Sequence, residues 1–110
     1  MVNKILTEAR IPYKETRFLT PPKTTYAVYE DAIQRRGGDH INLLNQHDIS
    51  LELYEYKPDP TAEASIEKQL DLLGLEFTKQ PRYWIESEQL YQVIYEFTYY
   101  QKEDLRNVSI

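Results

Sequence analysis

The fold is decided by residues 49–74, which read ISLELYEYKPDPTAEASIEKQLDLLG. In the first part, Ile49, Leu51 and Leu53 alternate with polar residues or tyrosine. A period of two is typical of a strand that buries one face. Residues 49–54 are therefore predicted to form a strand.

The second part has a helical period. Asp59 followed by Pro60 is a typical N-cap and first-turn pair, and Gly74 stands where a C-terminal cap belongs. The apolar stripe between them consists of Ala62, Ile66, Leu70 and Leu73. We expect this helix to pack against the strand before it.

The N-terminal half predicts a helix, a loop and a hairpin. Apolar residues at helical spacing favour a short helix over 2–9, and 11–23 contains three prolines and reads as an extended loop from which Phe18 reaches the core. Residues 24–33 are rich in β-branched and aromatic side chains and predict a strand. A turn at 37–39 and a returning strand at 41–44 would complete a hairpin with a charged tip.

The C-terminal half predicts a short edge strand, 75–79 and 83–86, interrupted at Pro81, and a long strand over 90–100. Residues 103–110 are expected to fray. The predicted class is α+β: an antiparallel or mixed sheet of four to five strands, with two helices on one face, in the order α-β-β-β-α-β-β. A length of 110 residues predicts a single domain, 1–110.

Composition excludes several classes of protein. Without cysteine the chain has no disulfide framework and no thiol nucleophile, and it contains no apolar run of the roughly 20 residues that a membrane helix needs. The net charge of -5 argues against direct binding to nucleic acid. We therefore expect a soluble protein of a reducing cytoplasm, with no membrane partner and no cofactor.

Charge and tyrosine point to protein contacts. Residues 1–23 carry a net +3, so the rest carries −8, and the chain has 10 tyrosines against 1 tryptophan and 3 phenylalanines. Tyrosine suits surfaces that become buried on contact, although a tyrosine-rich core, or a third layer made by the 11–23 loop, is an open alternative. The candidate interface residues are Arg35, Arg36, Tyr54, Tyr56 and Tyr99.

The candidates for chemistry are few. His40 and His47 do not have a usual metal-ligand spacing, so no metal site is predicted. An enzyme or ligand-binding domain could use Asp39, His40 and Asp48, or the pair Glu86 and Glu88. These groups lack the glycine, serine or histidine contexts that catalysis usually shows, so the prediction is that the chain is not an enzyme.

Several stretches resemble a known family. They are 11–13 (IPY), 25–29 (TYAVY), 37–39 (GGD), 47–54 (HDISLELY) and 90–97 (LYQVIYEF). Together they are similar to the tail-completion, or tail-terminator, proteins of tailed phages and prophages. Neighbouring head–tail joining proteins look much alike.

The resemblance implies an assembly function. Such proteins form rings, typically hexamers, that cap the tail tube and join it to the head, and they have no catalytic residues. The implied partners are further copies of the chain and tail-tube or connector proteins. The implied location is the host bacterial cytoplasm during assembly and then the tail or neck of the virion.

Overall fold

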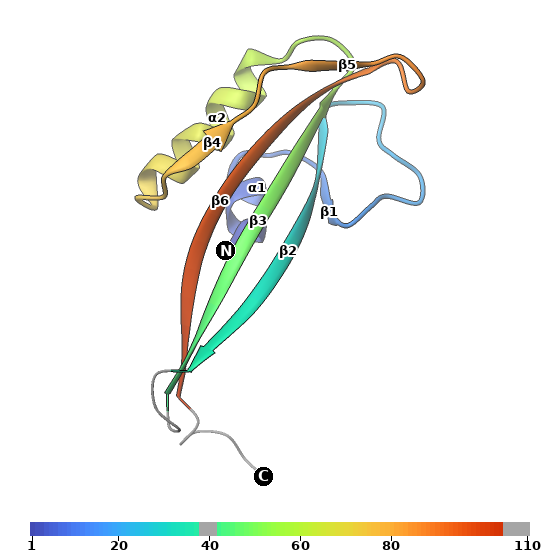
Figure 1. Ribbon diagram of the computed structural model, residues 1–110. Helices are drawn as coiled ribbons and strands as arrows, with labels where there is room; N and C mark the ends of the chain where they lie inside the picture. The colour runs from blue at the N-terminus through green and yellow to red at the C-terminus, as the bar shows by residue number, and fades with distance from the viewer. Residues whose placement is uncertain (38–41, 105–110) are drawn as a thin grey trace.

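The computed structural model describes residues 1–37 and 42–104, which form two helices and six strands (Figure 1). In chain order these are α1 (Val2–Glu8), β1 (Tyr13–Glu15), β2 (Tyr26–Gly37), β3 (Asn42–Glu55), α2 (Pro60–Leu72), β4 (Phe77–Lys79), β5 (Tyr83–Ile85) and β6 (Leu90–Asp104). Neither described helix is long and apolar enough to cross a membrane.

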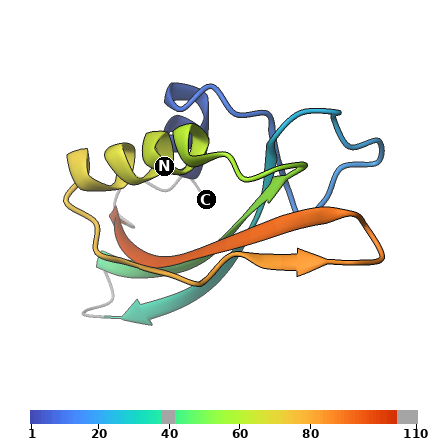
Figure 2. The ribbon, with the colours of Figure 1, turned by 90° about the horizontal axis from the view of Figure 1, so that it is seen from above.

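All six strands belong to one sheet. Its order is β1-β2-β3-β6-β4, and β5 pairs with β6 as well. The β1–β2 pair is parallel and the other pairs are antiparallel, so the sheet is mixed. Figure 2 shows both helices on the same side of the sheet. The predicted α+β class is confirmed, with one strand more than the predicted four to five.

The core lies between the helices and the sheet. Alternate side chains of the long strands reach it, because successive residues of a strand point to opposite faces. Each fully buried aliphatic side chain contributes about 1.5–3 kcal/mol. From the sheet come Ala27, Ile49, Leu51, Leu53, Val93, Tyr95 and Phe97, and from the helices Val2, Ile5, Leu6, Ala62, Ile66 and Leu70. The predicted packing of the second helix on the 49–54 strand is confirmed.

The caps of α2 are those that its sequence predicts. Asp59 is the N-cap, and its Oδ1 accepts from the Ala62 backbone N–H at 3.1 Å. Its Oδ2 accepts from the Thr25 hydroxyl at 2.6 Å, which ties the start of the helix to the segment before β2. Gly74 has φ +68, the left-handed conformation that ends a helix and that glycine adopts without strain.

Two predicted strands are one. The sequence predicts separate strands at 41–44 and 49–54, but β3 runs without interruption. Between them Gln46 and Asp48 are polar, and the alternation of apolar and polar residues that predicts a strand is interrupted there. The prediction was wrong because β3 is central and pairs on both sides, with β2 and with β6, so its peptide groups are satisfied whatever side chains it carries.

The loop predicted at 11–23 contains a strand and covers part of the second sheet face. Tyr13 to Glu15 pair with β2 as β1. Phe18 does not enter the main core but contacts Tyr26 edge-on, with ring centroids 5.4 Å apart. Tyr26 in turn stacks on Tyr54 at 5.2 Å. The third layer left open by the sequence therefore exists at this end of the sheet.

At the other end the sheet projects as an arm. Beyond the helices, β2, β3 and β6 continue as a three-stranded ribbon (Figure 1), and the molecule measures 49 × 29 × 21 Å. We call the described residues 30–37, 42–48 and 98–104 the arm. β6 is longer than predicted and includes residues 103 and 104. The rest of the tail predicted to fray, and residues 38 and 39 of the predicted turn, lie outside the described residues.

Candidate functional site

The arm is held together by a buried histidine. His47 on β3 is buried, and its Nδ1 lies 2.9 Å from an Asp31 carboxylate oxygen on β2. Its Nε2 lies 3.1 Å from Oε1 of Gln101 on β6, and its ring stacks on Tyr99 with centroids 4.4 Å apart. Both ring nitrogens therefore lie within hydrogen-bond distance of a side-chain oxygen on a neighbouring strand. This contact links all three strands of the arm through side chains.

The opposite face of the arm has a second polar contact. Asp48 accepts from the Thr98 hydroxyl at 2.7 Å and from the Gln46 amide at 3.1 Å. The arm also exposes apolar surface. Ile33 on the helix side and Tyr100 on the other side are each 59% exposed. A projection that exposes large apolar groups is suited to contact another protein.

A buried charge cluster connects β3, α2 and the β4–β5 segment. Glu55 is completely buried, and one of its oxygens lies 3.1 Å from Nε of Arg82. The same guanidinium donates to Glu63 at 2.6 Å. Lys79 binds Glu63 at 2.9 Å and Glu67 at 2.8 Å. Two basic groups thus serve three carboxylates.

The two buried carboxyls of this cluster have pKa values that are shifted in opposite directions. No donor faces Oε2 of Glu55 among the described residues, although that atom is buried. Burial, together with the neighbouring Glu63 carboxylate, raises the pKa of Glu55 to about 7. Burial also acts on Glu63, but hydrogen bonds from Glu55, Arg82 and Lys79 outweigh it and lower its pKa to about 2. Of the two carboxyls, Glu55 is therefore the one that takes up a proton first as pH falls.

Sequence reasoning missed this cluster, although a signal was present. Glu55 continues the inward alternation of Leu51 and Leu53, and Glu63 lies three residues before Ile66 on the buried stripe of α2. A carboxylate at a position that the period assigns to the core predicts a buried, partnered charge. The basic partners come from a later segment, 79–82, which local patterns do not connect to either carboxylate.

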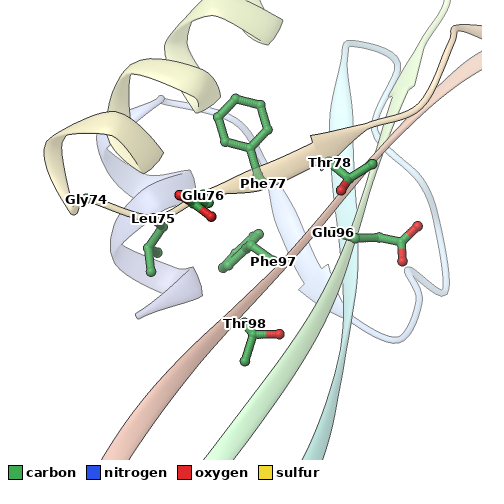
Figure 3. A pocket seen from close by; sticks show the side chains of 8 residues that line it. All are labelled: Gly74, Leu75, Glu76, Phe77, Thr78, Glu96, Phe97 and Thr98. Atoms are coloured by element: carbon green, nitrogen blue, oxygen red, sulfur yellow. The ribbon is translucent and has the colours of Figure 1, made fainter.

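Two of the surface hollows lie against the sheet. One, of about 250 Å³, lies against the stacked tyrosines, and its lining includes Phe18, Ile85 and Glu52. Burial and the Glu30 carboxylate raise the pKa of Glu52. The other opens where β4 leaves β6; Figure 3 shows Phe77, Phe97 and Glu96 in its lining. No group of acidic, histidine or cysteine side chains suited to a metal occurs in the part of the chain that the structure describes.

One comparison with known proteins gives a similar structure. A chain in the virion of a native gene transfer agent (GTA) particle superposes with a TM-score of 0.57, covering 86% of this chain and 81% of that chain. The two sequences are 14% identical, so the likeness concerns the fold. No family model and no curated protein matches the sequence.

The predicted interface residues lie in three places. Arg35 is exposed on the arm, and Arg36 belongs to β2, but its side chain lies outside the described part. Tyr54 stacks on Tyr26, and Tyr56, 46% exposed, donates to the Pro22 carbonyl at 2.8 Å. Tyr99 is half-buried on the helix side of the arm, against His47. Their role in an interface stays a prediction.

The described residues include only some of the alternative catalytic residues. Asp39 and His40 lie outside the described residues, and Asp48 points to the sheet face opposite His47. Glu86 and Glu88 were expected on one strand face. They lie in the turn after β5, because β5 ends at Ile85, and Glu86 accepts from the Trp84 indole at 2.5 Å.

Proposed function

We propose that this chain is a structural protein of a tailed-phage or phage-like particle, and that it caps the tail tube and joins tail to head through ring-forming contacts. The projecting arm carries this proposal. Its described residues combine an internal side-chain contact that joins three strands, Asp31–His47–Gln101, with exposed apolar groups. The fold similarity to a chain of a gene transfer agent virion supports a place in such a particle.

A ring of identical subunits requires two different, complementary patches on each copy. The charge distribution supports this, because residues 1–23 are basic and the remainder is acidic. The proposed partners are copies of this chain, six to a ring, and the tail-tube or connector proteins at each side. The proposed locations are the host bacterial cytoplasm during assembly and then the tail or neck of the virion.

No observation in the described residues favours the alternative of a small enzyme or ligand-binding domain. Asp48 is engaged by Thr98 and Gln46, and Glu86 and Glu88 lie on an exposed turn. The larger hollow is open, and its lining includes the apolar rings of Phe77 and Phe97. Assembly is therefore the function that the geometry supports best.

Deletion of the gene tests the proposal. We expect particles that lack it to show heads and tails that do not join, or tails of irregular length, when counted by electron microscopy. A plasmid-borne wild-type copy should restore joined particles, and the protein should be detected in them by mass spectrometry. Normal yields of joined, infectious particles without the gene would contradict the proposed function.

A further inference from the structure

At Asp31 and Ile33, the outer edge of β2 has no neighbour among the described strands. The Tyr29 carbonyl accepts from Thr16 N–H at 2.9 Å, so the peptide groups of Tyr29 face the β1 side. Because these groups alternate along a strand, those of Asp31 and Ile33 face the same way. β1 ends its pairing at Tyr29, and no described strand pairs with these two residues on that side.

The outer edge of β6 is open in the same region. The Ile94 carbonyl accepts from Gln80 N–H at 2.9 Å, which shows that the even-numbered residues of β6 face the β4 side. β4 pairs only as far as Phe97. Beyond Phe97, no other strand in the described part of the chain pairs with the outer edge of β6 at Thr98, Tyr100 and Lys102. The hollow of Figure 3 marks the point where β4 leaves this edge.

We propose that the β2 edge of one copy pairs with the β6 edge of the next copy, so that the arms form one continuous sheet. This proposal rests on the ring of the proposed function and assigns its contact. Asp31 and Ile33 on β2 present backbone N–H and C=O groups that no other described strand pairs, and Thr98, Tyr100 and Lys102 on β6 present the complementary groups. The contact joins different edges head to tail, which is the type of contact that closes into a ring.

The strand directions and side-chain faces fit this contact. β2 and β6 are both antiparallel to β3, so they run parallel to each other. A neighbour related by rotation about an axis along the arm would therefore place its β6 parallel to β2. In a parallel ladder the outward-facing odd residues of β2 align with odd residues of β6. Odd residues of both strands point to the helix side, so both sheet faces continue across the joint.

Apolar side chains support a second copy as the occupant. Ile33 on β2 and Tyr100 on β6, each 59% exposed, lie beside the two open edges on opposite faces. Edge pairing would cover Ile33 of one copy on the helix-side face and Tyr100 of its neighbour on the opposite face. Soluble proteins usually protect long open edges, since these edges otherwise pair indiscriminately. A neighbouring copy protects both edges of every subunit in a closed ring.

Disulfide trapping tests which edges meet, because the chain has no cysteine of its own. Ala32→Cys and Tyr100→Cys place thiols at exposed positions on the same sheet face of β2 and β6. We expect cross-linked dimers only when the two variants are mixed; a second mixture with Lys102→Cys covers a register shift of two residues. Lys57→Cys, exposed but at the other end of β3, is the control partner.

Proline substitution separates the edge from the ring. Ile33→Pro removes an outward-facing N–H, which an edge strand tolerates, whereas Ile33→Ser removes only the apolar side chain. We expect Ile33→Pro to stay folded by circular dichroism and to raise the concentration for half-assembly in light scattering by at least about tenfold. Ile33→Ser should have a smaller effect, because it retains the donor.

The outcomes distinguish this contact from the ring itself. If Ala32→Cys links to itself, if mixtures link no better than the control, or if oligomers form unchanged with Ile33→Pro, the edge pairing is wrong while the ring survives. If the wild type stays monomeric to about 1 mM, both the ring and its contact are wrong. Incorporation into particles is measured separately and tests the assembly function alone.

Discussion

Glu55 and Glu63 bind the same guanidinium, that of Arg82, at 3.1 and 2.6 Å. One carboxyl comes from the end of β3 and the other from the first turn of α2. The pair therefore fixes the start of the helix and the β4–β5 segment on the sheet. Because Glu55 takes up a proton at a higher pH than an ordinary carboxyl, the stability of the fold depends on pH.

The first prediction concerns that proton. The pKa of Glu55 is raised from 4.5 to about 7, so its contribution to stability is fully present below pH 4.5 and is lost as pH rises through 7. The pKa of Glu63 is lowered to about 2, so its contribution is lost as pH falls from 4.5 through 2. For the wild type we expect the free energy of unfolding to fall between pH 5 and 8 by roughly 1–3 kcal/mol.

Glu55→Gln should flatten this change, since a neutral amide at this position does not titrate. Urea denaturation at pH 5 and pH 8 measures both proteins. Glu86→Gln, a change on the exposed turn, is the matched control and should keep the wild-type slope. Equal slopes for Glu55→Gln and the wild type would show that Glu55 does not hold the proton.

The second prediction concerns Arg82. Arg82→Met should lower the free energy of unfolding by about 2–3 kcal/mol, because it leaves the Glu63 carboxylate buried with one fewer cation. The loss is smaller than for a fully buried pair, since Arg82 is 33% exposed. Glu63→Gln in the Arg82→Met background should recover part of it. Strict additivity of the two changes in a double-mutant cycle would mean that the groups are not coupled.

The third prediction concerns the core. Leu70 is fully buried on α2, and Leu70→Ala should cost about 2–5 kcal/mol through lost burial and a cavity. Leu72, two residues later, is 70% exposed, and Leu72→Ala should change stability by less than about 0.5 kcal/mol. The midpoints of urea denaturation compare them. If the two variants had similar midpoints, our assignment of the buried face of α2 would be wrong.

The fourth prediction concerns the charged end of the arm. Arg35→Glu with Arg36→Glu should leave thermal stability nearly unchanged but weaken self-association, if these side chains meet the acidic surface of a neighbour. Wild-type association should then decrease as salt increases. Lys57→Glu with Lys68→Glu makes the same charge change at exposed positions outside the basic segment 1–23 and outside the arm. Self-association is measured by light scattering. If both double variants associate equally, the two arginines do not take part in the contact.

Local patterns in the sequence determined α2, both faces of β6 and the α+β class. Each depends on spacing within one segment: the stripe Ala62, Ile66, Leu70 and Leu73 needs only the helical period, and the caps Asp59 and Gly74 need only local backbone geometry. The tertiary structure decided the rest. Tyr13–Glu15 became a strand because β2 offered an edge, and polar residues 45–48 stayed in β3 because it is paired on both sides. Burial of Glu55 depends on Arg82, 27 residues away in the chain, and the open edges exist only where β1 and β4 end. These features arise from contacts between segments that are distant in the sequence. The spacing of residues within one segment does not predict the free energy of such contacts.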